Sequence, residues 1–255
     1  MSTKTATVTV HFASFNTARV SELCLRSMHA LAGHPFQLIV GDCDSNDGSI
    51  NMLQRYERAG ACTLQIARGG RRHGEWLDLW LKTATSTYVV FCDSDVEFLR
   101  PNWLAEMVQA AEVSGATLVA TRIQARDGVA YTHPATGAAA TLAARPEPWL
   151  MLIRTEPSQQ LNASFLYEER VQSDGSKIAY DTAAAFFREL ELAGLTFVEM
   201  PAKFARSFRH YSGMTWQGRG IPLRRQLKQI AKRMTVWIRW QRSKVAHRSA
   251  TQLTK

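Results

Sequence analysis

Two aspartates separated by a single residue are the first candidates for chemistry in this sequence. Asp93 and Asp95 directly follow the apolar run YVVFC of residues 88–92, with Ser94 between them. Side chains two positions apart on an extended chain point the same way, so both carboxylates face one side. Carboxylate oxygens are the ligands that Mg²⁺ and Mn²⁺ prefer. The pair therefore predicts a site for a divalent cation, although a turn or a helix cap would use the same residue types.

Two further apolar runs end in residues that suit a binding site. Residues 7–12 lead to Phe15, and residues 36–40 lead to Asp42. Ligands of open α/β sheets bind at the carboxyl ends of the strands. These adjacent strand ends would carry an aromatic ring, a carboxylate and the aspartate pair. Together they would form a suitable binding surface for a nucleotide diphosphate.

The elements that must position these residues alternate between strands and helices along the first hundred residues. We expect strands at residues 7–12, 36–40, 62–67 and 88–92. We expect helices between them, at residues 19–31, 50–59 and 75–83. Near-continuous apolar strands linked by helices predict an α/β fold, with helices on both faces of a doubly wound, mainly parallel sheet.

The second half of the chain is less regular. Helices are expected at residues 103–114 and 182–193, and strands at residues 116–121, 151–154 and 197–201. Residues 125–147 mix Gly, Pro and Ala with little periodicity. Residues 204–216 are expected to form a loop rich in aromatic and basic side chains.

Four motifs, in the same order, resemble those of the family-two glycosyltransferases of the GT-A fold. ASFN of residues 13–16 and DCDSNDGS of residues 42–49 correspond to sequences that follow the first and second strands in that family. RHGEWLD of residues 72–78 resembles its H-G-x-x-L-D motif, and CDSDV of residues 92–96 resembles its D-x-D motif. The resemblance implies a GT-A fold and a transferase. Its donor would be a nucleotide-diphosphate sugar, UDP-linked in the first instance, and the sugar would pass to an acceptor hydroxyl with inversion.

The resemblance implies a role for each matching residue. Phe15 would stack on the nucleobase, and Asp42 would accept a hydrogen bond from the pyrimidine N3–H. Arg68 or Arg72 would face the phosphates, and Asp78 the donor sugar. The further residues assigned to donor binding are Ala13, His73, Asp93 and Ser94. Structural roles remain open for these positions, with Phe15 in the core, Asp42 as a turn cap and the arginines on the solvated surface.

The resemblance also implies a metal site and a general base. Asp95, with Asp93 beside it, and a late histidine, His210, would hold Mn²⁺ or Mg²⁺. Asp181 opens the helix expected at residues 182–193 and corresponds to the carboxylate that deprotonates the acceptor hydroxyl in this family. A carboxylate at a helix N-terminus is stabilised in its ionised form, which suits a base. The alternative is that Asp181 only caps the helix.

The excess of positive charge lies in the C-terminal tail. Of the 31 Lys and Arg residues, eleven fall in residues 219–255, which contain no Asp or Glu, so the preceding residues hold 20 basic and 22 acidic side chains. Apolar residues recur in the tail at helical spacing: Leu223, Leu227, Ile230, Met234, Trp237 and Ile238. A basic amphipathic helix with a tryptophan at its apolar edge is typical of anionic membrane surfaces. Packing on the domain, dimerisation and nucleic-acid binding are the alternatives.

Length and composition indicate a globular protein with room for one large α/β domain in its 255 residues. We expect a GT-A domain at residues 1–218 and a basic tail at residues 219–255. Residues 1–100 would be the nucleotide-binding half of the domain, and residues 101–218 the acceptor-side half.

Three features bear on the compartment and the acceptor. The N-terminus lacks the pattern of a secretory signal, the four cysteines stand singly, and no apolar run approaches the roughly 18 residues of a membrane span. We therefore expect a cytoplasmic protein that contacts the inner face of the membrane peripherally. The family resemblance implies an acceptor that is lipid-linked or a polysaccharide, as in the synthesis of cell-surface polysaccharide or glycolipid.

Three other functions are alternatives to this one. A nucleotidyltransferase should carry a phosphate loop rich in Gly and Lys or Arg after the first strand, and ASFNTARV of residues 13–20 lacks it. A non-catalytic homologue that binds nucleotide sugars would be expected to lose the D-x-D motif or the acidic helix start, and both are present. A nucleic-acid binder is disfavoured by the slightly acidic body and by the lack of a recognised module, so no nucleic-acid partner is expected.

Overall fold

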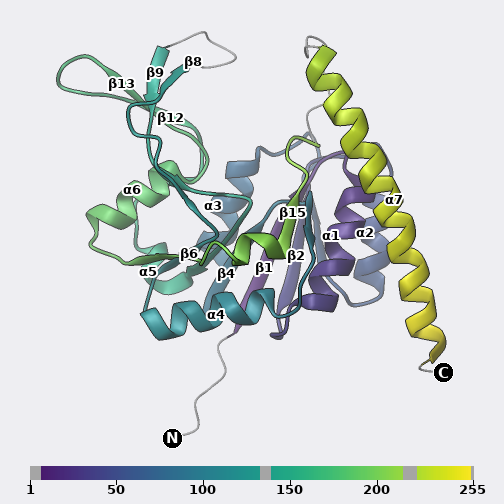
Figure 1. Cartoon of the computed structure of the whole chain (residues 1–255). Helices are drawn as coiled ribbons and strands as arrows, with labels where there is room; N and C mark the ends of the chain where they lie inside the picture. The colour runs from purple at the N-terminus through teal and green to yellow at the C-terminus, as the bar shows by residue number, and fades with distance from the viewer. Residues whose placement is uncertain (1–6, 133–138, 215–222, 254–255) are drawn as a thin grey trace, which may run out of the picture.

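A seven-stranded sheet runs through the computed structural model, which describes residues 7–132, 139–214 and 223–253 and, in the last range, the side chains of 228–243 (Figure 1). The strands lie in the order β14-β6-β11-β4-β1-β2-β3. Their bounds are β1 Val8–Ser14, β2 Gln37–Asp42, β3 Thr63–Ile66, β4 Tyr88–Cys92, β6 Leu118–Ala120, β11 Leu150–Arg154 and β14 Phe197–Glu199. Neighbours pair in parallel except β11, which is antiparallel to β4 and β6. The prediction of a mainly parallel sheet is confirmed.

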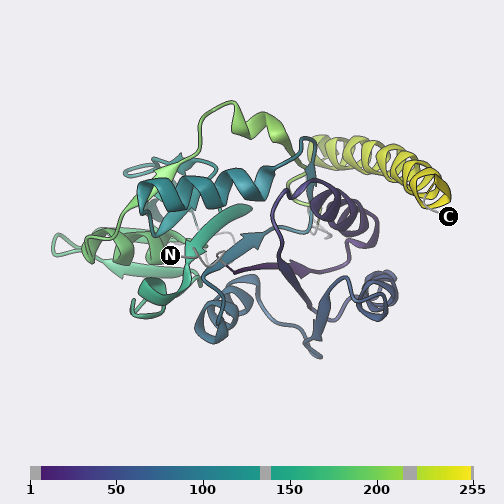
Figure 2. The ribbon, with the colours of Figure 1, turned by 90° about the horizontal axis from the view of Figure 1, so that it is seen from below.

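Helices cover both faces of this sheet (Figure 2). Their bounds are α1 Ala18–Leu31, α2 Ser49–Arg58, α3 His73–Thr83, α4 Trp103–Ser114, α5 Thr155–Gln159 and α6 Ala184–Leu192. Side chains of α1, α2 and α4 belong to one hydrophobic cluster, and those of α3 and α6 belong to another. The doubly wound arrangement expected from the sequence is therefore present.

The two clusters explain why β4 is apolar along its whole length. Tyr88, Val90 and Cys92 point into the first cluster, and Val89 and Phe91 into the second. All five side chains are at most 2% exposed. Because a central strand has no solvated face, the first polar residue after it, Asp93, marks the edge of the sheet.

A smaller sheet, formed by strands between residues 130 and 180, projects from the rest of the fold and is visible at the upper left of Figure 1. Its four strands, in sheet order, are β12 Glu168–Val171, β13 Lys177–Tyr180, β9 Ala139–Leu142 and β8 Ala130–Thr132. Two further short strands, β7 Ile123–Gln124 and β10 Arg145–Pro146, pair with each other. Residues 125–147 therefore contain more regular structure than their weak periodicity indicated. These strands are short and largely exposed or half-buried, so burial imposes no clear alternation on them.

The segment after β14 corrects the expectation of a loop over residues 204–216. Residues Phe204–Ser207 form a turn of 3₁₀ helix, and β15, Phe208–His210, pairs antiparallel with β5, Val96–Phe98. Two strands of three residues each are too short to produce a visible alternation in the sequence. The pairing sets His210 opposite Val96, next to Asp95.

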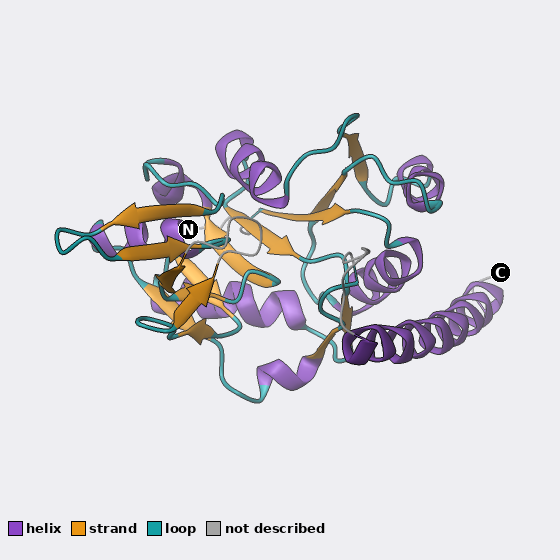
Figure 3. Ribbon diagram, turned by 90° about the horizontal axis from the view of Figure 1, so that it is seen from above, coloured by secondary structure: helices purple, strands orange, loops and turns teal. Residues whose placement is uncertain are grey.

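The basic tail contains α7, Leu223–Leu253, which lies along the outer side of α1 (Figures 1 and 3). Val236 is 2% exposed and packs with Val20 and Leu23 of α1. Trp240 Nε1 donates a hydrogen bond to Glu22 at 2.6 Å. The predicted helix is therefore present and docked on the domain. The side chains of Leu223 and Leu227 lie outside the described part of the chain.

The apolar stripe expected on α7 does not provide that docking. Ile230, Met234, Trp237 and Ile238 are 42–60% exposed, because they lie on the side of the helix turned away from α1. Across the described ranges, every helix is too short or too polar to cross a lipid bilayer.

Candidate active site

A cleft of about 1190 Å³ opens where the carboxyl ends of β1 and β4 meet the surface. Its lining also includes the start of α3, residues 145 and 147–149, residues just after β15, and the first described side chains of α7. Residues far apart in the sequence thus surround one space beside the D-x-D motif.

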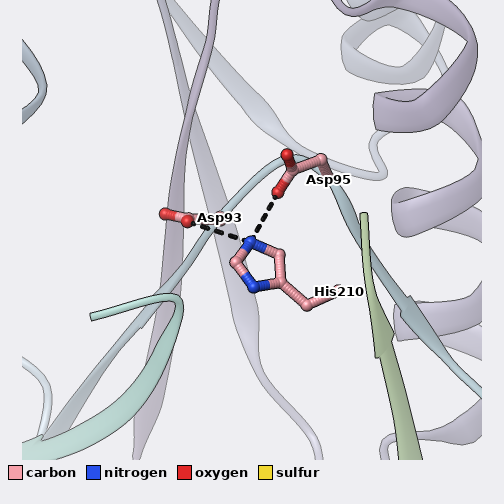
Figure 4. Close-up of side chains that lie close together, drawn as sticks. All are labelled: Asp93, Asp95 and His210. Atoms are coloured by element: carbon pink, nitrogen blue, oxygen red, sulfur yellow. Dashed lines mark ion pairs between the residues drawn. The ribbon is translucent and has the colours of Figure 1, made fainter. Parts of the chain in front are cut away.

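Asp93, Asp95 and His210 form a cluster on the floor of this cleft (Figure 4). His210 Nε2 lies 3.1 Å from Asp95 Oδ1 and 3.6 Å from Asp93 Oδ2. One ligand atom from each residue lies within 4.8 Å of the others. The end of β4 supplies the aspartates and the end of β15 supplies the histidine, so the predicted metal residues are brought together.

The chemistry of Asp95 fits a bound cation. The side chain is 8% exposed, and its Oδ1 accepts no hydrogen bond within the described ranges. The imidazole is within ion-pair distance of that oxygen but is not aligned as a hydrogen-bond donor. A buried carboxylate oxygen without a donor is costly, and a divalent cation would satisfy it.

The two aspartates change the protonation of His210. Burial lowers the pKa of the imidazole, but the adjoining carboxylates of Asp93 and Asp95 outweigh burial and raise the pKa to about 9. For Asp93 the effects have the opposite sign. Burial raises the pKa of its carboxyl, but the neighbouring His210 and His73 outweigh burial, so the pKa lies below its usual value. Without a metal, a protonated His210 therefore supplies the positive charge between the carboxylates.

The Trp149 ring stacks on the face of the His210 ring, and sequence reasoning missed this residue. The two rings stack with centroids 5.2 Å apart and planes 27° apart. The Trp149 Nε1–H donates to Glu147 Oε2 at 2.9 Å, and the Trp149 carbonyl accepts from the Asp93 amide at 2.9 Å. The sequence RPEPW of residues 145–149 offered a signal, because two prolines stiffen a segment with charged and aromatic side chains.

Most of the residues predicted to bind the donor or the metal line the cleft. These are Ala13, Phe15, Arg72, His73, Asp93, Ser94, Asp95 and His210. Phe15 is 41% exposed, so its ring is available for stacking. His73, at the start of α3, places Nε2 at 3.8 Å from Asp93 Oδ1. Arg72 is paired with Glu75 at 2.7 Å.

Arg71, Arg145, Lys228 and Lys232 also line the cleft, and sequence reasoning did not select them. The Arg71 guanidinium lies over the Trp76 ring, 4.6 Å from its centroid. Cationic side chains are common in any sequence, so their spacing along the chain gave no signal. Only the fold shows that these four share a cleft.

Two of the predicted donor residues, Asp42 and Arg68, do not line the cleft. Asp42 is fully buried, and its two carboxylate oxygens accept hydrogen bonds at 2.8 Å from the amide and the hydroxyl of Ser45. Arg68 is paired with Asp44 at 3.2 Å. In this structure both residues stabilise turns near the strand ends.

Asp78 holds a neighbouring segment in place. Its carboxylate accepts hydrogen bonds from Ser164 Oγ at 2.6 Å and from the Phe165 amide at 2.7 Å. Gly74 permits the same approach, because a Cβ at that position would lie 2.6 Å from the Phe165 carbonyl oxygen. The Gly and Asp of the H-G-x-x-L-D motif thus anchor residues 164–165 against α3, and Asp78 is outside the cleft lining.

Asp181, the predicted base, is paired with two arginines. Its carboxylate lies 3.1 Å from Arg126 Nη1 and also contacts Arg145 Nη1. The N-cap position of α6 is Ala183, and no side chain caps the helix there. Asp181 is not an N-cap in this structure. Arg145 lines the cleft and Asp181 does not, so the carboxylate adjoins the cleft through Arg145.

Comparison with known proteins agrees with the family that the sequence motifs resemble. The family described as Glycosyl transferase family 2 matches residues 9–192. Mannosyltransferase PcManGT from Pyrobaculum calidifontis, in complex with GDP-Man and Mn²⁺, has a TM-score of 0.56 and 18% identity, covering 78% of this chain and 56% of that one. TarS from S. aureus in complex with UDP has a TM-score of 0.48 and 16% identity, covering 63% of this chain and 50% of that one.

The chain thus spans about half the length of these two solved structures. No curated protein matches the sequence significantly. At this level of identity, the likeness to PcManGT shows a shared fold.

Proposed function

The chain belongs to glycosyl transferase family 2, as its motifs predicted, and from that premise we propose that it moves a sugar from a nucleotide diphosphate to an acceptor hydroxyl with inversion. One observation carries the proposal: the Asp93, Asp95 and His210 cluster lies in a cleft with an exposed aromatic ring, Phe15, on its rim. A nucleotide-diphosphate donor offers a base for that ring and a charged diphosphate for the cluster.

We propose that residues 1–100 bind the donor. Phe15 is free to stack on the nucleobase. Asp42 has spare lone pairs for the N3–H of a pyrimidine, because a carboxylate can accept about four hydrogen bonds and Ser45 supplies two. Since Asp42 is fully buried, the turn that contains Ser45 would have to move to admit the base. PcManGT holds GDP-Man, so GDP-linked sugars belong in the first tests beside UDP-linked ones.

We propose that Asp93, Asp95 and His210 hold Mn²⁺ or Mg²⁺. Three protein ligands leave open positions for phosphate oxygens, and oxygen-rich ligand sets suit both metals. The metal would offset the charge that develops on the leaving diphosphate. Trp149 would keep the imidazole plane fixed through its stacking contact.

We propose that Asp181 accepts the proton of the acceptor hydroxyl. A general base must come within hydrogen-bond reach of the proton that it removes. In this role, Arg145 would give up its contact with Asp181 Oδ1, so that this oxygen can accept the proton of the acceptor hydroxyl. Arg126, which donates to both carboxylate oxygens, would keep the carboxylate in place. Residues 101–218 would then form the acceptor side, as expected from the sequence.

We propose that α7 docks on an anionic membrane surface, with a lipid-linked or polysaccharide acceptor nearby. The exposed stripe of Ile230, Met234, Trp237 and Ile238 has Arg233 and Arg242 exposed beside it. An exposed apolar face with basic flanks complements an anionic bilayer. This arrangement would suit the synthesis of cell-surface polysaccharide or glycolipid.

A donor screen tests the proposed reaction. The measurement is release of nucleoside diphosphate from UDP-, GDP- and TDP-sugars, with Mn²⁺ or Mg²⁺, by the wild type and by Asp95→Asn. Release by the wild type alone would support the assignment. Binding of a nucleotide sugar without release or transfer, across a panel of lipid-linked and polysaccharide acceptors, would favour a non-catalytic nucleotide-sugar-binding protein.

A further inference from the structure

One wall of the cleft comes from α7. Lys228, Gln229 and Lys232 line the same space as Asp93 and Asp95. These three positions share one face of a helix, because residues one and four apart lie within about 100° of each other. The basic tail therefore contributes to the site that the D-x-D motif marks.

This face of α7 is fixed to the segment that follows His210. Lys232 Nζ donates a hydrogen bond to the Ser212 carbonyl at 2.7 Å, and Gln229 Nε2 donates one to the Gly213 carbonyl at 3.5 Å. About two turns after Lys232, the Arg239 guanidinium contacts both carboxylate oxygens of Glu97, at 2.7 and 2.6 Å. The wall is thus held in a defined position relative to the metal cluster.

Both lysines retain unused hydrogen-bond donors. An ammonium group has three N–H donors, and Lys232 directs one of them to a carbonyl. Lys228 is exposed and makes no hydrogen bond or ion pair within the described ranges. By contrast, Arg72 on the other side of the cleft is already paired with Glu75. No acidic residue in α7 competes for the lysines.

We propose that Lys228 and Lys232 bind the diphosphate of the donor, beside the metal cluster. This assignment rests on the proposed function, because it requires a nucleotide-diphosphate donor. One divalent cation leaves part of the negative charge of a diphosphate uncompensated, and lysine ammonium groups are common phosphate ligands. The C-terminal helix would then be an integral part of the donor site.

The test uses the full chain with Lys228→Met, Lys232→Met and the double substitution. Arg233→Met is the matched control, since it removes the same charge from an exposed position outside the cleft lining. Calorimetry with Mn²⁺ and UDP, GDP or inorganic pyrophosphate gives the affinities. Each lysine substitution should weaken binding roughly tenfold, the double substitution more, and the control less than twofold. Lys228→Met is the cleaner variant, because Lys228 holds no other residue.

Two results would overturn the assignment alone. An equal loss of affinity for the probes in the double variant and in Arg233→Met would show a general effect of charge. Unchanged phosphate binding with tighter Mn²⁺ binding in the double variant would show that the lysines only balance the carboxylates. A wild type that binds none of the three probes would overturn the proposed function as well, so the two failures are distinguishable. Melting temperatures close to that of the wild type would confirm that the variants are folded.

Discussion

His210 Nε2 lies 3.1 Å from Asp95 Oδ1 because β15 pairs with β5 and sets His210 opposite Val96. The residue next to Val96 is Asp95, whose carbonyl accepts from the Tyr211 amide at 2.9 Å, so the strand pairing brings the backbones of Asp95 and His210 close together. The pairing is made by backbone hydrogen bonds, and a substitution at Asp95 should therefore leave it intact. Because the backbone pairing does not depend on the Asp95 side chain, conservative substitutions can test the proposed metal site without disturbing the strands.

The first prediction concerns the metal. Asp95→Asn keeps the size of the side chain and removes its charge, so Mn²⁺ affinity should fall by on the order of 100-fold or more, beyond the loss typical of outer-shell substitutions. Titration calorimetry with Mn²⁺ measures this loss. Glu106→Gln, on exposed α4 surface, is the control. Wild-type affinity in Asp95→Asn would remove Asp95 from the site.

The second prediction concerns the pH dependence of metal binding. Because Asp93 and Asp95 raise the pKa of His210 to about 9, the imidazole carries a proton at neutral pH that a metal must displace. Mn²⁺ affinity should therefore rise about tenfold per pH unit below pH 9 and level off above it. Titrations between pH 6 and 8 with Mg²⁺, which stays soluble there, provide a check. In His210→Gln the slope should be much smaller, and an equal slope in both proteins would show that another group titrates.

The third prediction separates two roles of Asp181. If it is the general base, Asp181→Asn should lower kcat by roughly 10²–10⁴-fold with little change in KM. The same substitution breaks the ion pairs with Arg126 and Arg145, so stability should fall as well. Steady-state kinetics on the folded fraction decides between the roles. Arg126→Gln also breaks one ion pair but keeps the carboxylate and its contact with Arg145, so it should lower stability and reduce turnover far less than Asp181→Asn does.

The fourth prediction concerns His11, at the centre of β1. The ring is 2% exposed, its centroid lies 4.9 Å from that of Trp80, and neither nitrogen forms a hydrogen bond within the described part of the chain. Burial lowers the pKa of His11 to about 3, whereas an unfolded chain has a value of about 6.5.

Because the unfolded state binds the proton more readily, the stability that neutral His11 contributes is complete above about pH 6.5. It should be lost as the pH falls toward 3, by about 1 kcal/mol per pH unit. Urea unfolding at several pH values, compared between the wild type and His11→Phe, isolates this slope. Parallel curves for the two proteins would contradict the prediction.

The fifth prediction concerns the outer face of α7. The double substitution Met234→Ser and Trp237→Ser should abolish binding to phosphatidylglycerol vesicles while donor hydrolysis persists, because both side chains are exposed and lie outside the cleft lining. Val113→Ser, which is 82% exposed on α4, should bind vesicles like the wild type. Binding of the wild type should weaken at high salt. If the wild type ignores vesicles and instead dimerises through this face, the stripe is a subunit interface.

The parts of the fold that sequence could predict are those with strong local patterns. β4 lies between two cores, so its apolar run and the position of Asp93 at its end were readable. β15 could not be predicted, because it and its partner β5 have three residues each, too few to show the alternation of a strand. His210 was nevertheless selected, through the family resemblance, although its surroundings were expected to be a loop.

Apart from residues that the family resemblance marked, such as His210, the candidate site was predictable where a residue's role depends on its neighbours in sequence. The D-x-D pair met this condition. Trp149 did not, since its contact with His210 depends on two strands meeting at one edge. The partners of Asp181 were likewise hidden, because Arg126 and Arg145 belong to short strands and loops with little periodicity.

If both proposals for α7 hold, its two faces would link attachment of this protein to a membrane with the concentration of its nucleotide-sugar donor. Lys228 and Lys232 lie on the face toward the cleft, and the exposed stripe of Met234 and Trp237 lies on another face of the same helix. Thermodynamic linkage requires any coupling between two binding sites to be reciprocal. If a lipid surface tightens donor binding by some factor, a saturating donor tightens attachment to that surface by the same factor. Under that coupling, a fall in the concentration of nucleotide sugar would weaken membrane attachment by up to the same factor, without any separate signal.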